Sequence, residues 1–359
     1  MRFPEFSGEW EKYKLDEIAT ISKERIGVGM LSSSNYISTE NMKSNFGGVD
    51  LTASLPVSGN VIKFQQGDTL LSNIRPYLKK IWQARFDGGC SADILVFRSN
   101  KLCNQDFLYY TLANEKFISY AMSGAKGVKM PRGDKEQLLK YELHLPTATE
   151  QNKITSLLSL LDQRIKTQKK VIEDLKRLKY AISKRVFENH GSSNSMLLGK
   201  VADIYQPQTI PTSWLNDALQ YPVYGANGVI GKYSEYNHEN SQICIACRGN
   251  TCGTVNYSEP KSWITGNAMV INTDRYDVNK RFLFHQLCIV NYSTIISGSG
   301  QPQIVRAPLE KMKIWFPDED VQERIATFFD TIEERVLIEE TTLILAERMK
   351  QYLLSRLFI

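Results

Sequence analysis

Two stretches of the chain have apolar residues at alternating steps of three and four positions, one after Pro146 and one after Pro317. This spacing lines up apolar side chains on one face of a helix and is typical of a coiled-coil seam. The pattern therefore predicts two long helices. Their expected seam positions are Ile154, Leu158, Leu161, Ile165, Ile172, Leu175 and Ile182 in the first, and Ile325, Phe329, Ile332, Val336, Leu343, Leu353 and Leu357 in the second.

The length of these helices favours pairing between them. A helix from Glu150 to Phe187 would be about 57 Å long, because each residue adds about 1.5 Å. A helical hairpin inside one domain is one interpretation. The long stretch of other structure between the two helices favours a coiled coil instead. The polar residues in the seam, which would then fix its register, are Gln168, Lys179, Glu339 and Lys350.

The charges of the two helices also favour pairing. From Ala148 to His190 there are ten Lys or Arg and five Asp or Glu residues, whereas from Glu319 to Ile359 there are five and nine. Opposite net charges favour this pair over self-pairing of either helix. Antiparallel pairing would place the globular segments at opposite ends, a few tens of Å apart, which is comparable with one turn of duplex DNA at roughly 34 Å.

The chain also repeats itself. One constant offset relates Pro131 to Pro302 and Pro146 to Pro317, and the same offset relates every seam position of the first helix to one of the second. Farther upstream, LDEIATI (Leu15–Ile21) resembles LGKVADI (Leu198–Ile204) at a slightly larger offset. A match held over so long a stretch indicates a tandem duplication whose halves differ in the middle.

The segments outside the helices mix short strand patterns with turns, and each ends in an amphipathic helical stretch, 106–124 or 280–298. The predicted fold class is α+β: two α/β globular domains joined by two long helices in an antiparallel coiled coil, as a pseudo-twofold internal repeat. The expected boundaries are 1–147 for the first globular domain, 148–190 for the first helix, 191–318 for the second globular domain and 319–359 for the second helix.

Loop residues in both globular segments suit contact with nucleic acid. Arg reads guanine and Asn or Gln reads adenine through paired hydrogen bonds, while Lys and backbone amides hold phosphates. Each residue taken alone could equally be part of an ordinary solvated turn. The candidates are Asn73, Arg75, Tyr77, Lys79, Lys126, Lys129 and Arg132 in the first half, and Tyr224, Asn227, Lys232, Arg248, Asn250, Gln301, Gln303 and Arg306 in the second.

Composition and motifs exclude several function classes. The net charge of +5 permits an acidic partner without requiring one. There is no phosphate-binding G-x-x-x-x-G-K-[ST] loop, no Asn/Asp-Pro-Pro-aromatic methyltransferase site and no Ser/His/Asp arrangement. The spacing of Cys244, Cys247 and Cys252 does not suit zinc, and the six cysteines are expected to be reduced thiols of a cytoplasmic protein. No apolar run is long enough to span a membrane.

Ordered motifs across the whole chain resemble a known family. These are W-x-x-x-x-L-x-E-I near the start, YPVYGANGVIG, CIACRGNTCG, WITGNAMV, GSGQPQI, and the pair PTATEQNKI and PDEDVQERI. Together they are similar to the specificity subunits of type I restriction-modification systems. The first half departs from the pattern, since it has GAKGVKMPR in place of GSGQPQIVR.

The resemblance implies a non-catalytic DNA-recognition subunit that binds no cofactor or metal. Each globular domain would be a target recognition domain reading one half of a bipartite site. The helices would set the spacer and dock two modification subunits, which carry S-adenosylmethionine, and restriction subunits using ATP and Mg²⁺ would join them. Two other hypotheses remain: a self-contained nuclease or methyltransferase, for which no motif is present, and a coiled-coil scaffold that binds only protein.

Overall fold

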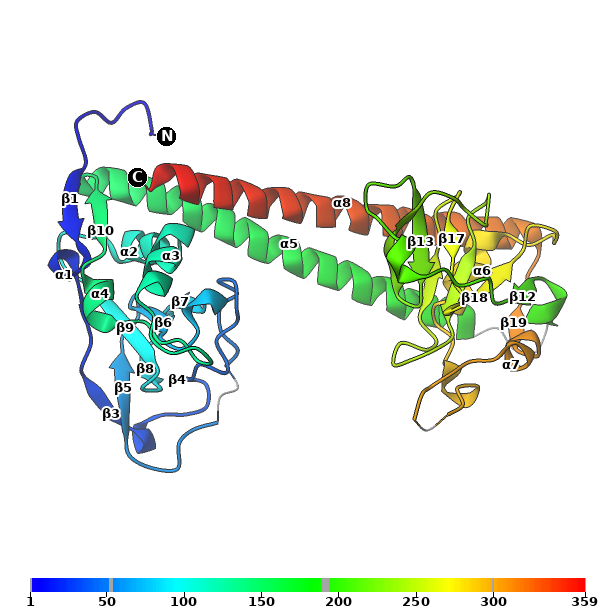
Figure 1. Ribbon diagram of the computed structural model, residues 1–359, viewed down its shortest axis with the longest axis horizontal. Helices are drawn as coiled ribbons and strands as arrows, with labels where there is room; N and C mark the ends of the chain where they lie inside the picture. The colour runs from blue at the N-terminus through cyan, green and yellow to red at the C-terminus, as the bar shows by residue number, and fades with distance from the viewer. Residues whose placement is uncertain (1, 52–53, 189–193, 299, 359) are drawn as a thin grey trace. The chain divides into compact units, whose positions relative to one another are not determined.

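Two long helices and several small sheets form the computed structural model, which describes residues 2–51, 54–188, 194–298 and 300–358 (Figure 1). The chain divides into two units: unit 1 comprises 1–168 and 342–359, and unit 2 comprises 169–341. Each unit therefore contains part of both long helices, α5 (Ala148–Glu188) and α8 (Glu319–Leu357). The predicted α+β class with an internal repeat is confirmed. The expected boundaries at 190, 191 and 359 lie outside the described residues.

Unit 1 is built on two four-stranded sheets, with strand orders β2-β9-β6-β7 and β3-β5-β8-β4, and a two-stranded β1-β10 pair. The strands are β1 (Glu11–Lys14), β2 (Ala19–Ile21), β3 (Arg25–Gly27), β4 (Tyr36–Ile37), β5 (Asn60–Phe64), β6 (Thr69–Ser72), β7 (Ile81–Gln83), β8 (Gly88–Cys90), β9 (Ile94–Ser99) and β10 (Glu142–Leu145). The shorter helices are α1 (Leu15–Ile18), η1 (Val28–Met30), η2 (Pro76–Leu78), α2 (Gln105–Leu112), α3 (Glu115–Ser123) and α4 (Lys135–Leu139).

Strand β9 shows why unit 1 has two apolar cores. It reads ILVF without polar alternation, because both of its faces are buried. Leu95 and Phe97 pack in the core that contains α2 and α3, whereas Ile94 and Val96 pack in the core between the two sheets. Successive side chains of a strand point to opposite faces, so one strand supplies both cores.

Unit 2 repeats this plan with a four-stranded sheet β12-β18-β15-β16, a three-stranded sheet β14-β13-β17 and a β11-β19 pair. The strands are β11 (Ser195–Leu197), β12 (Asp203–Tyr205), β13 (Tyr221–Gly225), β14 (Gly228–Tyr233), β15 (Ile243–Ala246), β16 (Val255–Tyr257), β17 (Trp263–Ile264), β18 (Ala268–Asn272) and β19 (Lys313–Trp315). The shorter helices are η3 (Leu198–Lys200), η4 (Thr212–Trp214), α6 (Lys280–Leu287), η5 (Tyr292–Thr294) and α7 (Arg306–Glu310).

The same polar contact fastens a long helix to each unit. In unit 1, the Gln151 side chain accepts from the backbone N–H of Asn104 at 2.8 Å and donates to the Pro146 carbonyl at 3.0 Å. In unit 2, Gln322 accepts from the N–H of Asn279 at 3.0 Å and donates to a proline carbonyl at 2.8 Å. Both Gln side chains are buried, and both Asn residues cap the following helix. The repeat therefore extends to individual hydrogen bonds.

Within each unit the two long helices run antiparallel. In unit 1, Lys350 of α8 pairs with Asp162 of α5 at 2.5 Å. In unit 2, Lys179 of α5 pairs with Glu333 of α8. The constant offset between the repeats relates Asp162 to Glu333 and Lys179 to Lys350. Each repeat therefore contributes one acid and one lysine at equivalent positions. The lysines that interrupt the apolar pattern are therefore ion-paired.

The expected seam residues are all buried or half-buried. Several of them also pack on a globular core, which the heptad pattern alone did not indicate. Ile154, Leu158, Leu353 and Leu357 belong to the main core of unit 1, and Phe329 packs with Phe282 of α6 in unit 2. Among the described residues, no helix is both long enough and apolar enough to cross a membrane.

A network of half-buried ion pairs around the buried His285 joins the helices of unit 2. The Nε2 of His285 on α6 lies 2.7 Å from an oxygen of Asp330, and Arg281 donates to Asp330 at 2.7 Å and to Glu333 at 2.5 Å. A histidine with two carboxylates could hold a metal ion. Here the cations of Arg281 and Lys179 already pair with those carboxylates. We interpret the cluster as a structural network.

This network predicts that unit 2 loses stability as the pH falls below about 6.5, the usual pKa of histidine. Burial lowers the pKa of His285, although its bond to Asp330 opposes the shift. The unfolded chain then binds the proton at a higher pH than the folded chain, so acidification favours unfolding. When the helix-capping residues Asn104 and Asn279 are aligned, Tyr110 of α2 corresponds to His285 of α6. Replacing His285→Tyr should therefore reduce this dependence.

The measurement is the urea unfolding midpoint at several pH values between about 7.5 and 5.5, bracketing the usual histidine pKa. The midpoint of the variant should still fall with decreasing pH, but less steeply than that of the wild type, because burial also lowers the pKa of His238 in the same unit. Equal slopes in the wild type and the His285→Tyr variant would contradict this assignment.

Candidate nucleic-acid interface

In unit 1 the fold joins two loops that are far apart in the sequence. One loop follows β6 and the other links α3 to α4 (Figure 1). Lys126 and Arg132 exchange two backbone hydrogen bonds of 2.9 Å, which close the second loop. The N–H of Arg75 donates to the Pro131 carbonyl at 2.7 Å, and the N–H of Gly133 donates to Asn73 at 3.2 Å. The two basic clusters predicted in this half are therefore one surface.

Unit 2 joins its corresponding loops with the same bonds. Ser297 and Gln303 exchange backbone hydrogen bonds of 2.9 and 2.8 Å. The N–H of Gly249 donates to the Pro302 carbonyl at 3.0 Å, and that of Ile304 donates to the Cys247 carbonyl at 3.0 Å. The Gly-Gln-Pro-Gln segment is thus held against the loop after β15. We call each pair of joined loops a recognition frame, 73–80 with 124–134 in unit 1 and 247–254 with 296–306 in unit 2.

These bonds correct one alignment of the repeats. Residue type alone aligns SNIRPYLKKIW (Ser72–Trp82) with IACRGNTCGTV (Ile245–Val255) and so predicts that Arg75 lies opposite Arg248. The structure instead matches Arg75 to Gly249, since both donate to the proline carbonyl and both have positive φ, 51° and 81°. Arg248 corresponds to Ile74. Positive φ is unusual for a residue with a side chain and is commonest at functional positions.

The cations of the unit 1 frame differ in how they are paired. Lys126 binds Asp134 at 2.7 Å, and this hydrogen bond lowers the pKa of the Asp134 carboxyl. Arg132 lies 3.1 Å from Asp93, and Lys79 lies 2.5 Å from the Glu115 carboxylate. Lys80 donates to the Thr39 carbonyl at 2.6 Å. The remaining two, Arg75 and Lys129, are exposed and have no side-chain partner among the described residues. They are the cations most available to a phosphate.

The frame also contains two uncharged candidates. The ring of Tyr77 is 48% exposed, which leaves it available for stacking. Asn73 is half-buried, and its side-chain oxygen has no hydrogen-bond partner among the described residues. Its backbone positions the loop, since its N–H donates to the Asp93 carbonyl at 2.8 Å.

The unit 2 frame carries more amides than charges. Arg248, Asn250, Gln301 and Gln303 are exposed, and no described residue engages their side chains. Arg306 is exposed but lies 2.7 Å from Glu310 one turn along α7. Exposed Arg and amide groups on a rigid backbone are suited to hydrogen bonds with base edges.

The hairpin of β13 and β14 is a separate feature. Asn227 and Lys232 are exposed there, as expected for contact residues. Tyr224 is buried, and its hydroxyl accepts from the backbone N–H of Glu259 at 3.0 Å. Burial also raises the pKa of its phenol. Tyr224 thus lies inside the unit, packed with Cys244 and Ile264, because β13 is buried on both faces at this point.

Three exposed residues in or next to the unit 1 frame were not singled out from the sequence. Lys135, just after the frame, is the first residue of α4, and Arg306 is the first residue of α7. The offset that relates the two helix seams could therefore have identified Lys135. It lines a cleft of about 690 Å³ together with Lys23 and Arg25. Val128 is fully exposed and Met130 is 49% exposed between the basic residues of the loop.

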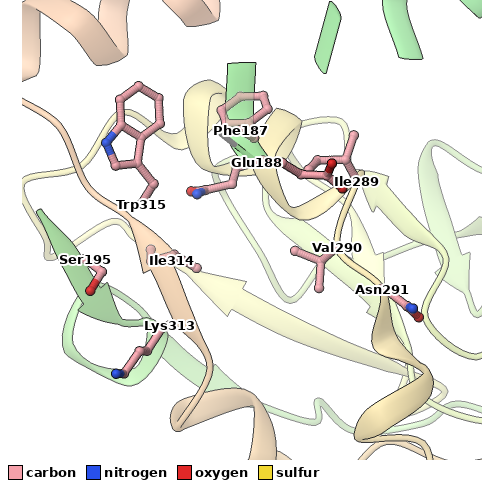
Figure 2. Close-up of a pocket in the computed structure, with 10 residues that line it drawn as sticks. Phe187, Glu188, Ser195, Ile289, Val290, Asn291, Lys313, Ile314 and Trp315 are labelled. Atoms are coloured by element: carbon pink, nitrogen blue, oxygen red, sulfur yellow. The ribbon is translucent and has the colours of Figure 1, made fainter. Parts of the chain in front are cut away.

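A second cavity, of about 450 Å³, lies in unit 2 where the end of α5 meets β19. Figure 2 shows the rings of Phe187 and Trp315 on its wall, with Ser195 and Lys313 on neighbouring strands. No described residue of its lining forms a cluster of acids or an activated nucleophile. This cavity therefore offers no catalytic arrangement.

The three clustered cysteines do not converge on a metal site. Cys244 packs in the core beneath β13, whereas Cys247 packs in the core beneath α6. Burial raises the pKa of the Cys244 thiol to about 12, which keeps it protonated. All six cysteines are free.

Comparison with known proteins gives a consistent result. A family model described as "Type I restriction modification DNA specificity domain" matches residues 7–177 and 193–348. The chain is 29% identical over 110 residues to the EcoprrI specificity subunit of Escherichia coli, covering 31% of this chain and 27% of that protein. It is 30% identical over 152 residues to the MjaVIII specificity subunit of Methanocaldococcus jannaschii, covering 41% and 33%. The alignments thus span about a third of each relative.

Solved structures share the fold. A type I restriction-modification S subunit from M. genitalium superposes with a TM-score of 0.69 at 16% identity, covering 100% of this chain and 99% of that one. A chain from a structure on complex assembly and conformational transition of a type I R-M system gives 0.60 at 19% identity, covering 98% and 97%. At these identities the likeness is evidence for the fold alone.

Proposed function

From the premise that this chain belongs to the family of type I restriction modification DNA specificity domains, we propose that it is the DNA-recognition subunit of a type I restriction-modification complex. Each unit reads one half of a bipartite site in double-stranded DNA. The chain itself is non-catalytic. The family model matches twice, once in each repeat, which agrees with one recognition frame in each unit.

The observation that best supports the proposal is that both units contain a recognition frame. A frame fixed by backbone bonds leaves its exposed side chains free for a ligand, and the same frame carries different residues in the two units. Arg132 in unit 1 corresponds to Gln303 in unit 2, and Lys129 corresponds to Gly300. A common backbone with different contact residues is suited to two different half-sites.

The long helices set the spacer between the half-sites and dock the partner subunits. Apolar side chains are exposed on α8 away from the seam: Leu345, Met349 and Tyr352 in unit 1 lie at helical spacing and are 55–59% exposed. Exposed apolar faces of this kind mark protein contact sites. The partners are two modification subunits, which supply S-adenosylmethionine chemistry, and restriction subunits, which supply ATP- and Mg²⁺-dependent cleavage. All of these components work in the cytoplasm.

The test is long-read sequencing of methyladenine in cells that contain the partner modification subunit, with and without the gene for this chain. We expect a bipartite methylated motif that depends on the gene. If purified modification subunit and this chain together produce no motif-specific methylation, the proposal is wrong and a protein-binding scaffold becomes the better interpretation.

A variant tests the recognition frame within that complex. Gln301→Ala combined with Gln303→Ala should weaken binding to the recognised duplex by roughly tenfold or more, since base-edge contacts contribute about 1–3 kcal/mol each. Asn240→Ala, an exposed amide of unit 2 outside the frame, is the matched control and should leave affinity unchanged. Unchanged binding by the double variant would remove this loop from the DNA contact.

A further inference from the structure

The recognition frame of unit 1 displays two exposed apolar side chains in the loop between Lys126 and Arg132. Val128 is fully exposed and Met130 is 49% exposed. The offset that relates the two helix seams places Gln301, an exposed amide, opposite Met130. At the Met130 position, therefore, the apolar residue belongs to the first unit and is not part of what the two repeats share.

The backbone holds this pair in a short closed loop. The two bonds between Lys126 and Arg132 form its stem, and Gly127 turns it with a φ of 99°. A Cβ atom on Gly127 would lie only 3.3 Å from the Met130 carbonyl oxygen, so the turn is tight. The bond from Arg75 to Pro131 fixes the far side of the loop. The loop thus presents its apolar side chains from an ordered base.

Cations surround the apolar pair. Lys129 lies between Val128 and Met130 in the sequence and has no described partner, and Arg75 is equally unpaired on the adjoining loop. Apolar side chains exposed singly are ordinary on protein surfaces. Two of them in one closed loop, with an unpaired cation between them and another on the adjoining loop, match the chemistry of DNA-deforming proteins. Such proteins insert an aliphatic residue between base pairs while basic residues hold the phosphates.

We propose that Val128 and Met130 form an apolar wedge that enters the DNA at a base step of the first half-site and partly unstacks it. This inference rests on the proposed function, since it requires the first unit to meet DNA. Lys129 and Arg75 hold the phosphates beside the opened step. The corresponding loop of unit 2, with Gln301 at the Met130 position, lacks this wedge residue.

The test uses the full complex of this chain with its modification subunits, bound to a duplex that carries the site found by methyladenine sequencing. 2-Aminopurine, whose fluorescence rises on unstacking, replaces each purine of the first half-site in turn. The adenine that becomes methylated is left in place, because methyltransferases flip their target base. We expect a rise at one step with the wild type, and its loss to the free-duplex level with Val128→Ser combined with Met130→Ser.

Val57→Ser is the matched control. Val57 is as exposed as Val128 and belongs to the same unit, but no Lys or Arg lies within five residues of it on either side. This variant should give the wild-type fluorescence. The wedge is excluded if the wild type shows no rise, or if the double variant keeps it. It is also excluded if the only defect of the double variant is that it does not assemble with the modification subunits. That result would make Val128 and Met130 a protein contact. A wild-type complex without site-specific binding would instead refute the proposed function.

Discussion

Replacing Phe329 with alanine should lower the free energy of unfolding of unit 2 by about 3–5 kcal/mol, the usual cost of removing a buried phenylalanine. Phe329 is fully buried on α8 and stacks on Phe187 of α5, with ring centroids 5.7 Å apart. Phe282 of α6 belongs to the same cluster. The substitution would leave a cavity where both long helices meet the globular part of the unit, and the surrounding rings could fill it only partly.

The neighbouring phenylalanine provides the control. Phe328 is 48% exposed, so Phe328→Ala should change the free energy of unfolding by about 0.5 kcal/mol or less. Both variants are compared with the wild type by urea unfolding followed by tryptophan fluorescence. Similar losses for the two variants would show that the cluster around Phe329 does not hold the helices to unit 2.

The second large effect concerns the glutamines that fasten the long helices. Gln322→Leu preserves much of the side-chain volume but leaves the backbone N–H of Asn279 and the Pro317 carbonyl without their partner. Each buried polar group left unpaired costs about 1–3 kcal/mol, so the expected loss of stability is about 2 kcal/mol or more. Gln151→Leu should have a similar effect in unit 1, because it removes the same pair of bonds.

Gln163→Leu on the exposed face of α5 is the matched control for this substitution. Its amide makes only a 3.5 Å contact with Ser159, so the change should be within about 0.5 kcal/mol. The readout is again the urea midpoint. If Gln322→Leu costs no more than Gln163→Leu, the paired hydrogen bonds are replaced by water and do not fasten the helix.

Sequence periodicity predicted the long helices well because it reports a single physical requirement, burial of one helix face. Lys179 and Lys350 were expected to fix the register of the seam, which stays a prediction, and a charge within an apolar seam also needs a partner. The identity of those partners, Glu333 and Asp162, followed only from the antiparallel arrangement. A heptad pattern does not indicate which residues of the two helices face each other.

The candidate interface was less predictable. The two loops of each frame are joined by backbone hydrogen bonds, which depend on conformation and leave little trace in residue type. Arg75 was therefore matched to the wrong residue, because side-chain identity suggested Arg248 while the shared positive φ identified Gly249. Tyr224 was chosen for its chemistry, and its burial was not foreseen because β13 is buried on both faces, so that Val223 and the adjacent Tyr224 are both covered. Whether the frame residues bind DNA stays a prediction.

The composition of unit 1 has a consequence for how the chain folds during synthesis. The ring of Phe107 in α2 lies 5.0 Å from that of Phe358, and the Asn114 side chain donates to the Leu354 carbonyl at 2.9 Å. The core of unit 1 therefore closes only after residues 342–358, which follow unit 2 in the chain, have been made. Unit 2, drawn wholly from 169–341, can be complete earlier. While residues 342–358 are still to be synthesised, the apolar side chains of unit 1 that they cover stay exposed, and exposed apolar surface makes a nascent chain prone to aggregation.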